Sequence, residues 1–199
     1  ANMQCFTCKC SVVGDKGVGK TSLIITSATS QFPSEYVPNT CDPKEITGKI
    51  GTEDFMLQLI DLPVPLEYDR LRPPAYPSYD GYLICFSVID PASFENVETK
   101  WLREAPSYIY NSSTPFVLIG TKADLRTDPD VVEKLAKNGS APVTFKQGKM
   151  LAKKTKALKY IECSALTHEN LASLPTELVS ALQEQYLKRT KKKRECQVL

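Results

Sequence analysis

Histidine is nearly absent from this chain, since His168 is the only one among 199 residues. There is no histidine cluster, and the close cysteines Cys5, Cys8 and Cys10 have no second group of ligands to complete a zinc site. The seven cysteines are odd in number and scattered, which is typical of reduced thiols that fill a core rather than of a disulfide framework. His168 stands beside an expected helix start and is assigned no role.

The chain also lacks a secretory signal and any run of 18 apolar residues. We therefore expect it neither to span a membrane nor to enter the secretory pathway. Its length fits one domain, and hydrophobic and charged contents of 42% and 24% are those of a soluble globular protein.

Charge is distributed unevenly along the chain, although the net charge is only +2. Residues 188–194 hold six of the 25 basic residues and no acidic one, which leaves 19 basic against 23 acidic residues elsewhere. No aromatic residue interrupts this basic run, and a nucleic-acid-binding protein would spread its basic residues over a folded face with aromatics between them. We therefore expect no nucleic-acid partner.

Strand-like apolar runs alternate with helical patterns, which predicts an α/β fold with a largely parallel sheet. The expected strands are residues 5–13, 44–50, 54–60, 81–88, 115–121 and 159–163. The expected helices are residues 20–30, 92–109, 146–156 and 175–187, the last with one apolar face formed by Leu174, Leu178, Val179, Leu182 and Tyr186. A turn over residues 48–54 joins the second and third strands without a helix, so these two are expected to be antiparallel in a mixed sheet.

The segment 14–21 reads Gly-Asp-Lys-Gly-Val-Gly-Lys-Thr, a complete Gly-x-x-x-x-Gly-Lys-Thr loop between an expected strand and an expected helix. Such glycines let backbone N–H groups surround a di- or triphosphate, Lys20 can reach the β- and γ-phosphates, and the Thr21 hydroxyl can bind Mg²⁺. An ordinary glycine-rich turn is the alternative, but the flanking strand and helix favour nucleotide binding. The expected phosphate-binding residues are Gly14, Asp15, Lys16, Gly17, Val18, Gly19, Lys20, Thr21 and Ser22.

Two later loops indicate that the base is guanine. The Asp124 carboxylate, in the run Thr121-Lys122-Ala123-Asp124, can accept hydrogen bonds from guanine N1–H and the exocyclic amine, and the Lys122 stem can cover the ring. A second loop after the last strand can bring a backbone N–H to guanine O6; it contains Ser164, Ala165 and Leu166. Either loop alone could be a solvated loop, but three such loops in this order together point to GTP or GDP.

With these motifs the chain resembles the Ras superfamily and, within it, the Rho/Rac family of small GTPases, over nearly all of residues 3–199. The matching segments are residues 32–38, 68–73, 85–88, 93–97 and 162–167. Residues 133–138 lie in what resembles the helical insert of the Rho family, near 126–140.

This resemblance implies a P-loop small GTPase fold, a six-stranded mixed sheet flanked by helices, over residues 3–187, followed by a basic tail at 188–199. It implies Mg²⁺ with GTP or GDP on the phosphate loop, Phe32 near the base, Asp61 holding Mg²⁺ through water, and switch segments around residues 32–44 and 61–77. It implies an effector loop that includes Tyr36, Val37, Pro38 and Asp42, although Cys41 stands at an aromatic position. Implied partners are effectors and exchange factors of the Rho type and a GDP-dissociation inhibitor, with signalling to the actin cytoskeleton; we expect a monomer.

The chain departs from the family pattern around the γ-phosphate. The second switch begins Asp61-Leu62-Pro63-Val64-Pro65, where the family has Asp-Thr-Ala-Gly-Gln. Pro65 thus replaces the glutamine that orients the attacking water, and proline has neither an amide side chain nor an N–H. Val64 replaces the glycine whose N–H meets the γ-phosphate. Hydrolysis is therefore expected to be weak or absent.

Two further departures involve the phosphate loop and the first switch. Lys16 stands where the family keeps a glycine and where the arginine of a GTPase-activating protein would enter. That arginine contributes about 10³–10⁵ in rate, so we expect insensitivity to such proteins; Lys16 acting as a cation in cis is the alternative. Asn39 replaces the threonine that closes over Mg²⁺, and Thr40 could substitute if the loop slips. Neutral drift is the alternative explanation for all these changes, and no residue is assigned as catalytic.

These observations together predict a GTP-binding switch protein with little hydrolysis. The alternative from another class is a pseudo-GTPase interaction module that barely senses nucleotide. A P-loop kinase is a third option, disfavoured by the guanine loops and by the lack of an arginine-rich lid.

The sequence ends with Cys196-Gln197-Val198-Leu199, a C-a-a-X pattern whose final leucine favours geranylgeranylation of Cys196. One lipid anchors a protein weakly, and the run 188–194 can add about 1 kcal/mol per basic residue near an anionic leaflet. An accidental terminal cysteine is the alternative. We expect the protein at the cytoplasmic face of the plasma membrane or endomembranes, and in the cytosol when it is not anchored.

Overall fold

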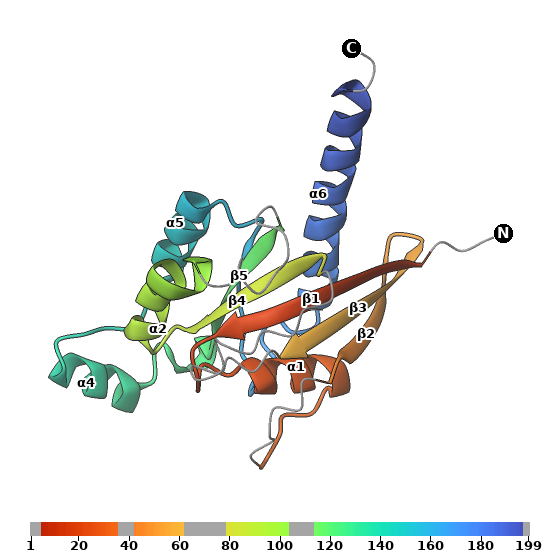
Figure 1. The fold of residues 1–199 in the computed structure, drawn as a ribbon. Coiled ribbons are helices and arrows are strands. Elements are labelled where there is room, and N and C mark those ends of the chain that lie inside the picture. Colours follow the sequence, from red (N-terminus) through yellow and green to blue (C-terminus); the bar gives the residue numbers. More distant parts are fainter. Residues whose placement is uncertain (1–4, 36–41, 62–78, 104–113, 197–199) are drawn as a thin grey trace, which may run out of the picture.

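Six strands form one sheet within residues 5–35, 42–61, 79–103 and 114–196, the part of the chain that the computed structural model describes. The strands are β1 (Phe6–Gly14), β2 (Lys44–Ile50), β3 (Glu53–Asp61), β4 (Gly81–Ser87), β5 (Phe116–Thr121) and β6 (Tyr160–Glu162). Their order across the sheet is β2-β3-β1-β4-β5-β6 (Figure 1). All neighbouring pairs are parallel except β2 and β3, which are antiparallel over Lys44↔Leu59 to Ile50↔Glu53. The expected mixed α/β sheet is confirmed.

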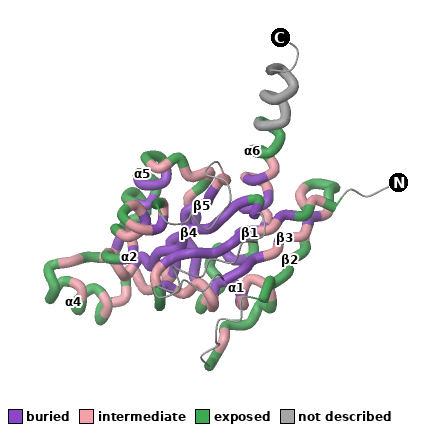
Figure 2. Tube along the Cα trace, viewed as in Figure 1, coloured by how far each residue is buried: buried purple, intermediate pink, exposed green. Residues whose placement is uncertain are grey.

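The helices alternate with these strands and cover both faces of the sheet. They are α1 (Lys20–Thr29), α2 (Pro91–Asn96) with the π-helical turn η1 (Val97–Trp101), the 3₁₀ turn η2 (Ala123–Leu125), α4 (Pro129–Lys137), α5 (Phe145–Thr155) and α6 (Leu174–Cys196). One core joins the sheet to α1 and α6 through residues such as Leu23 and Leu178. A second core, on the other face, includes Trp101 of η1 and Leu151 of α5. The central strands are accordingly buried on both sides (Figure 2).

Local sequence signals explain where several elements begin. The Asp90 side chain accepts a hydrogen bond from Ser93 N–H and caps α2, with Pro91 in its first turn. Thr144 and Gln147 form a reciprocal capping box at the start of α5. The expected helix over 92–109 starts one residue earlier and contains the turn η1, while residues 104–109 lie outside the described part.

Two helices go beyond the helical patterns identified in the sequence, and the first of them lies where the family resemblance implied a helical insert, near 126–140. α4 forms within the Pro- and charge-rich stretch 126–142; Asp128 caps it, and none of its residues is buried. α6 continues to Cys196 instead of ending at residue 187, because Lys and Arg are good helix formers and residues 188–196 contain no glycine or proline. Its outer end extends away from the sheet (Figure 1).

The apolar face expected for the last helix is only partly buried. Leu174, Leu178, Val179 and Leu182 are in the core, but Tyr186 is 60% exposed because α6 has by then passed beyond the sheet. None of the described helices combines the length and the apolar character needed to cross a membrane.

Candidate nucleotide-binding site

The phosphate loop lies between the end of β1 and the start of α1, at the carboxyl ends of the parallel strands where open α/β sheets bind ligands. Gly14 pairs with Cys85 of β4, and a Cβ at position 14 would lie 2.2 Å from the Cys85 carbonyl oxygen. Gly17 and Gly19 have φ of 81° and 98°. The glycines of the motif thus serve two needs, close packing against β4 at Gly14 and left-handed backbone at the other two.

The Lys20 side chain turns back over this loop. Its ammonium donates hydrogen bonds to the carbonyl oxygens of Gly14 (2.9 Å) and Asp15 (2.7 Å). The cation is therefore held against the loop itself, where a phosphate would lie on the backbone N–H groups. Lys16, in contrast, is exposed on the loop.

The Asp15 side chain fixes the phosphate loop to α2 and η1. Its carboxylate accepts hydrogen bonds from Asn96 Nδ2 (2.6 Å) and Trp101 Nε1 (2.8 Å). Trp101 is buried in the core between the sheet and η1. Sequence reasoning gave Asp15 only a place in the phosphate loop and missed both partners, because no local pattern connects positions 81 or more residues apart.

The expected Mg²⁺ ligands Thr21 and Asp61 lie together. The Thr21 hydroxyl donates to Asp61 Oδ2 at 2.5 Å, and the other carboxylate oxygen, Oδ1, is buried without a hydrogen-bond partner among the described residues. Burial raises the pKa of Asp61, while Thr21 and the Lys20 charge act in the opposite direction. An unsatisfied buried carboxylate oxygen beside a hydroxyl fits a hard divalent cation.

The described residues contain no group of three or more His, Cys, Asp or Glu side chains arranged to bind a metal. A magnesium ion here would therefore depend on Thr21 and Asp61 together with oxygens of the nucleotide and of water, as Mg²⁺ commonly does. Asn39 and Thr40, the alternative ligands expected from the first switch, lie outside the described residues.

A pocket next to the phosphate loop is formed by the two loops that the sequence assigned to guanine. Its volume is about 190 Å³, many times what a single water molecule needs, and so it admits a ligand much larger than an ion. Its lining consists of Gly19, Ser22, Leu23, Phe32, Thr121, Lys122, Asp124, Leu125, Cys163, Ser164, Ala165 and Leu166. Phe32 and Leu166 are 41% and 57% exposed, so both present apolar surface at the pocket to solvent.

Lys122 and Thr121 join this pocket to the phosphate loop. Lys122 has a left-handed backbone (φ 58°), and its ammonium donates to the Gly17 carbonyl oxygen at 2.7 Å. Its aliphatic stem therefore spans from β5 to the phosphate loop beside the pocket, as a cover for a flat ring requires. The buried Thr121 hydroxyl contacts the carbonyl oxygens of Val18 (2.5 Å) and Phe86 (3.0 Å), which makes Thr121 chiefly a positioning residue.

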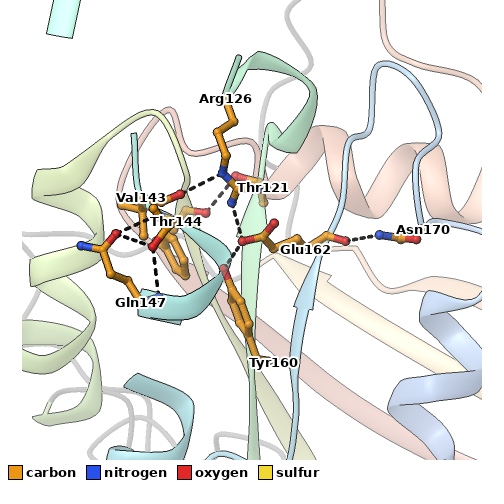
Figure 3. A network of polar contacts seen from close by, with 9 residues as sticks. Thr121, Arg126, Val143, Thr144, Gln147, Tyr160, Glu162 and Asn170 are labelled. Carbon is orange, nitrogen blue, oxygen red and sulfur yellow. Dashed lines mark hydrogen bonds and ion pairs between the residues drawn. The ribbon is translucent and has the colours of Figure 1, made fainter. Parts of the chain in front are cut away.

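A partly buried polar network connects the two loops of the pocket (Figure 3). Arg126, two residues after Asp124, donates to the Glu162 carboxylate at 2.5 Å and to the Val143 carbonyl oxygen at 2.9 Å. Glu162, which ends β6 and leads into residues 163–166, also accepts from the Tyr160 hydroxyl at 2.5 Å. The backbone N–H of Ala123 donates to the Cys163 carbonyl oxygen at 3.2 Å and joins the loops directly.

Most of the expected site residues are thus brought together, and others are not described. Gly19 and Ser22 line the pocket together with residues of both guanine loops, and Asp61 contacts Thr21 at the start of α1. Asp42 of the expected effector loop is exposed, and His168 has a left-handed backbone with φ of 64° but no place in the pocket. Tyr36, Val37, Pro38, Cys41, Pro63, Val64 and Pro65 lie outside the described residues.

Comparison with known protein families gives one result. The model of the Ras family matches residues 9–184. The matched region contains the phosphate loop, Asp61 and both loops of the pocket.

Proposed function

Because this chain belongs to the Ras family of small GTPases, we propose that it is a guanine-nucleotide switch of the Rho type that holds GTP and hydrolyses it slowly or not at all. The observation that carries the nucleotide part is that the pocket containing Lys122 and Asp124 adjoins the phosphate loop, to which Lys122 is hydrogen-bonded at Gly17. On that loop and the helix after it, Lys20 is held by the loop backbone and Thr21 is hydrogen-bonded to Asp61.

Different residues of the site are proposed to bind the phosphates, the base and the metal ion. The phosphate-loop backbone and Lys20 take the phosphates, and the Asp124 carboxylate selects a base with two adjacent N–H donors. Thr21 and Asp61 would hold Mg²⁺ together with the phosphates, and the bound ion would supply positive charge that neutralises the phosphate oxygens. Adenine offers no such donor pair, so discrimination against ATP follows from Asp124.

Slow hydrolysis is proposed from the sequence around the γ-phosphate. Pro65 brings no side-chain amide to orient a water molecule, and the exposed Lys16 replaces the glycine that the family resemblance places where an activating arginine would enter. The test is a single-turnover assay with γ-labelled GTP on the purified full chain, with and without a GTPase-activating protein. The matched variant K16G/P65Q should hydrolyse faster than the natural sequence and respond to the activating protein. Hydrolysis by the natural chain at an ordinary small-GTPase rate would refute this part.

The second candidate function is an interaction module that depends little on nucleotide. A simpler measurement distinguishes it from a nucleotide switch. Nucleotide extracted from the purified protein should be mostly GTP for a switch that stays loaded. Mostly GDP would indicate a working enzyme, and no nucleotide would favour the interaction module.

The Rho type, its partners and its location are part of the same proposal. Support comes from the sequence segments that match the Rho/Rac pattern and from helix α4, which occupies the stretch expected for the Rho insert. Effectors and exchange factors of the Rho type are then the expected partners. Lipidation at Cys196 and attachment to the cytoplasmic face of a membrane remain predictions of the sequence; C196S should leave nucleotide binding intact and release the protein from membranes.

A further inference from the structure

A second basic segment lies within the folded part of the chain, separate from the run at 188–194. Residues 145–159, which form α5 and lead into β6, contain six lysines and no acidic residue. The folded part as a whole carries more acidic than basic residues, so this concentration of one sign is local. Helix α5 is therefore the most strongly charged described element before the basic run.

The packing of α5 fixes which of its residues face solvent. Gly148, Leu151 and Ala152 are buried against the sheet, and the Tyr160 ring lies so close to Gly148 that a Cβ there would be 2.1 Å from it. The helix cannot rotate about its axis without losing this contact. The opposite side presents one exposed stripe, spaced i, i+3, i+4, i+7, consisting of Lys146, Lys149, Met150 and Lys153.

Within the described part of the chain, the ion pairs of this segment are formed by lysines outside the stripe. Two lysines of the segment form ion pairs, Lys154 with Glu98 (2.6 Å) and Lys159 with Glu177 (2.7 Å). Among the described residues, Lys146, Lys149 and Lys153 form none. Apolar surface lies beside them, because Met150 is 62% and Phe145 48% exposed, with the Lys149 ammonium 5.6 Å from the centre of the Phe145 ring.

We propose that this stripe of α5 binds the surface of an anionic membrane. This helix face is convex, so it offers no groove for a peptide. Its flexible ammonium groups also lack the planar pair of donors with which arginine binds a specific anion. A flat layer of negative headgroups requires neither feature. Exposed Met and Phe beside the lysines can enter the headgroup boundary, as apolar residues of interfacial helices do.

The position of α5 relative to α6 supports the same occupant. α5 and α6 pack on opposite faces of the sheet, and the Lys159–Glu177 ion pair joins the residue that precedes β6 to α6. Both helices extend toward the top of the view in Figure 1. A membrane that attracts the basic run of α6 would thus have a second basic contact on the folded domain. This inference extends the proposed membrane association but requires no lipid at Cys196.

The test uses the unlipidated full chain and vesicles of phosphatidylcholine with or without phosphatidylserine, in a cosedimentation assay. K146Q/K149Q/K153Q should weaken binding to the anionic vesicles by roughly fivefold per lysine, since each contributes about 1 kcal/mol near such a surface and 1.4 kcal/mol is tenfold. The matched control K44Q/K134Q/K137Q removes three exposed lysines from β2 and α4 and should bind as the natural chain does. M150Q should weaken binding and M150L should not.

A background in which the basic residues of 188–194 are changed to glutamine isolates α5. There the stripe variant should lose the remaining anion-dependent binding. Equal losses in the stripe and control variants, or equal binding of the natural chain to both vesicle types, would overturn the proposal. Stronger stripe-dependent binding to polyglutamate or to RNA than to vesicles would also overturn it and assign the surface to that partner. GDP binding, measured on every variant, should be unchanged, so a failure of the nucleotide proposal would be seen separately.

Discussion

The Arg126 guanidinium lies 2.5 Å from the Glu162 carboxylate, and this ion pair connects the loop that carries Asp124 with the loop that carries Ser164 and Ala165. The Glu162 side chain is 8% exposed and that of Arg126 25%, so water screens the pair only partly. The two loops of the base pocket therefore share one buried support instead of being held independently.

Removing this support should loosen the pocket. E162A strips hydrogen-bond partners from Arg126 and Tyr160, and losses of bonds to charged groups amount to about 1.5–3 kcal/mol. We expect E162A to have a lower melting temperature. It should also release a fluorescent GDP analogue faster, and by more than its loss of stability alone explains. E162Q keeps an acceptor oxygen, so both of its effects should be smaller. The control E98A breaks the exposed pair with Lys154 and should change stability by no more than about 0.5 kcal/mol. An E162A protein that releases nucleotide at the natural rate would contradict the positioning role.

Two glycines of the phosphate loop should respond differently to alanine. At Gly17 a Cβ meets nothing within 4 Å, and the cost is that of the left-handed backbone (φ 81°), about 1–2 kcal/mol. At Gly14 the Cβ would collide with the Cys85 carbonyl oxygen, so β1 and β4 must separate. Thermal unfolding with and without GDP should show G14A as clearly the less stable variant; equal effects would count against the close packing described here.

Asp124 should determine the base. D124N replaces one acceptor by a donor, so it should weaken GDP by about 10- to 150-fold, equivalent to a lost charged hydrogen bond of 1.5–3 kcal/mol. The same variant should gain affinity for xanthosine diphosphate, whose ring presents an oxygen where guanine has an amine. Competition against a fluorescent nucleotide measures both effects, and an unchanged preference would remove Asp124 from the pocket's specificity.

Cys163 should react slowly with alkylating reagents although it lines the pocket. Burial, together with the nearby Glu162 and Glu169 charges, raises its pKa to about 12, so little thiolate forms near pH 8. Cys5 is exposed and should be labelled before Cys163. A time course with iodoacetamide, read by peptide mapping with and without denaturant, checks this order; rapid labelling of Cys163 in the folded protein would contradict it.

The free energy of unfolding should fall at alkaline pH. A group whose pKa is raised in the folded state contributes stability that is fully present below its pKa in the unfolded state. That contribution is lost as the pH rises through the pKa of the group in the folded state. For Cys163 this window runs from its ordinary value of 9.0 to about 12. The free energy of unfolding of the natural chain should therefore decline above about pH 9 by up to about 1.4 kcal/mol per pH unit for each such thiol. C163A should decline less steeply, and parallel curves for the two proteins would refute this assignment.

Much of the fold and of the site could be predicted from local sequence. Alternating apolar runs and helical patterns predicted the six strands nearly to their ends, because strand and helix periods depend on neighbouring residues. Helix α6 is longer than predicted because the basic run was interpreted as a tail. The composition of that run favours a helix as well. The switch and effector-loop predictions lie outside the described residues.

The sequence by itself determined the ligand class, because the spacing of Gly14, Gly19, Lys20 and Thr21 dictates a local backbone that binds phosphate wherever it folds. It also predicted the base through Asp124, because the chemistry expected to recognise guanine belongs to one side chain. Only the tertiary structure decided that Asp15 is held by Trp101, that Arg126 pairs with Glu162, and that α5 turns its lysines outward. These contacts join residues far apart in the chain, and they depend on strand register and helix packing, which no local pattern specifies.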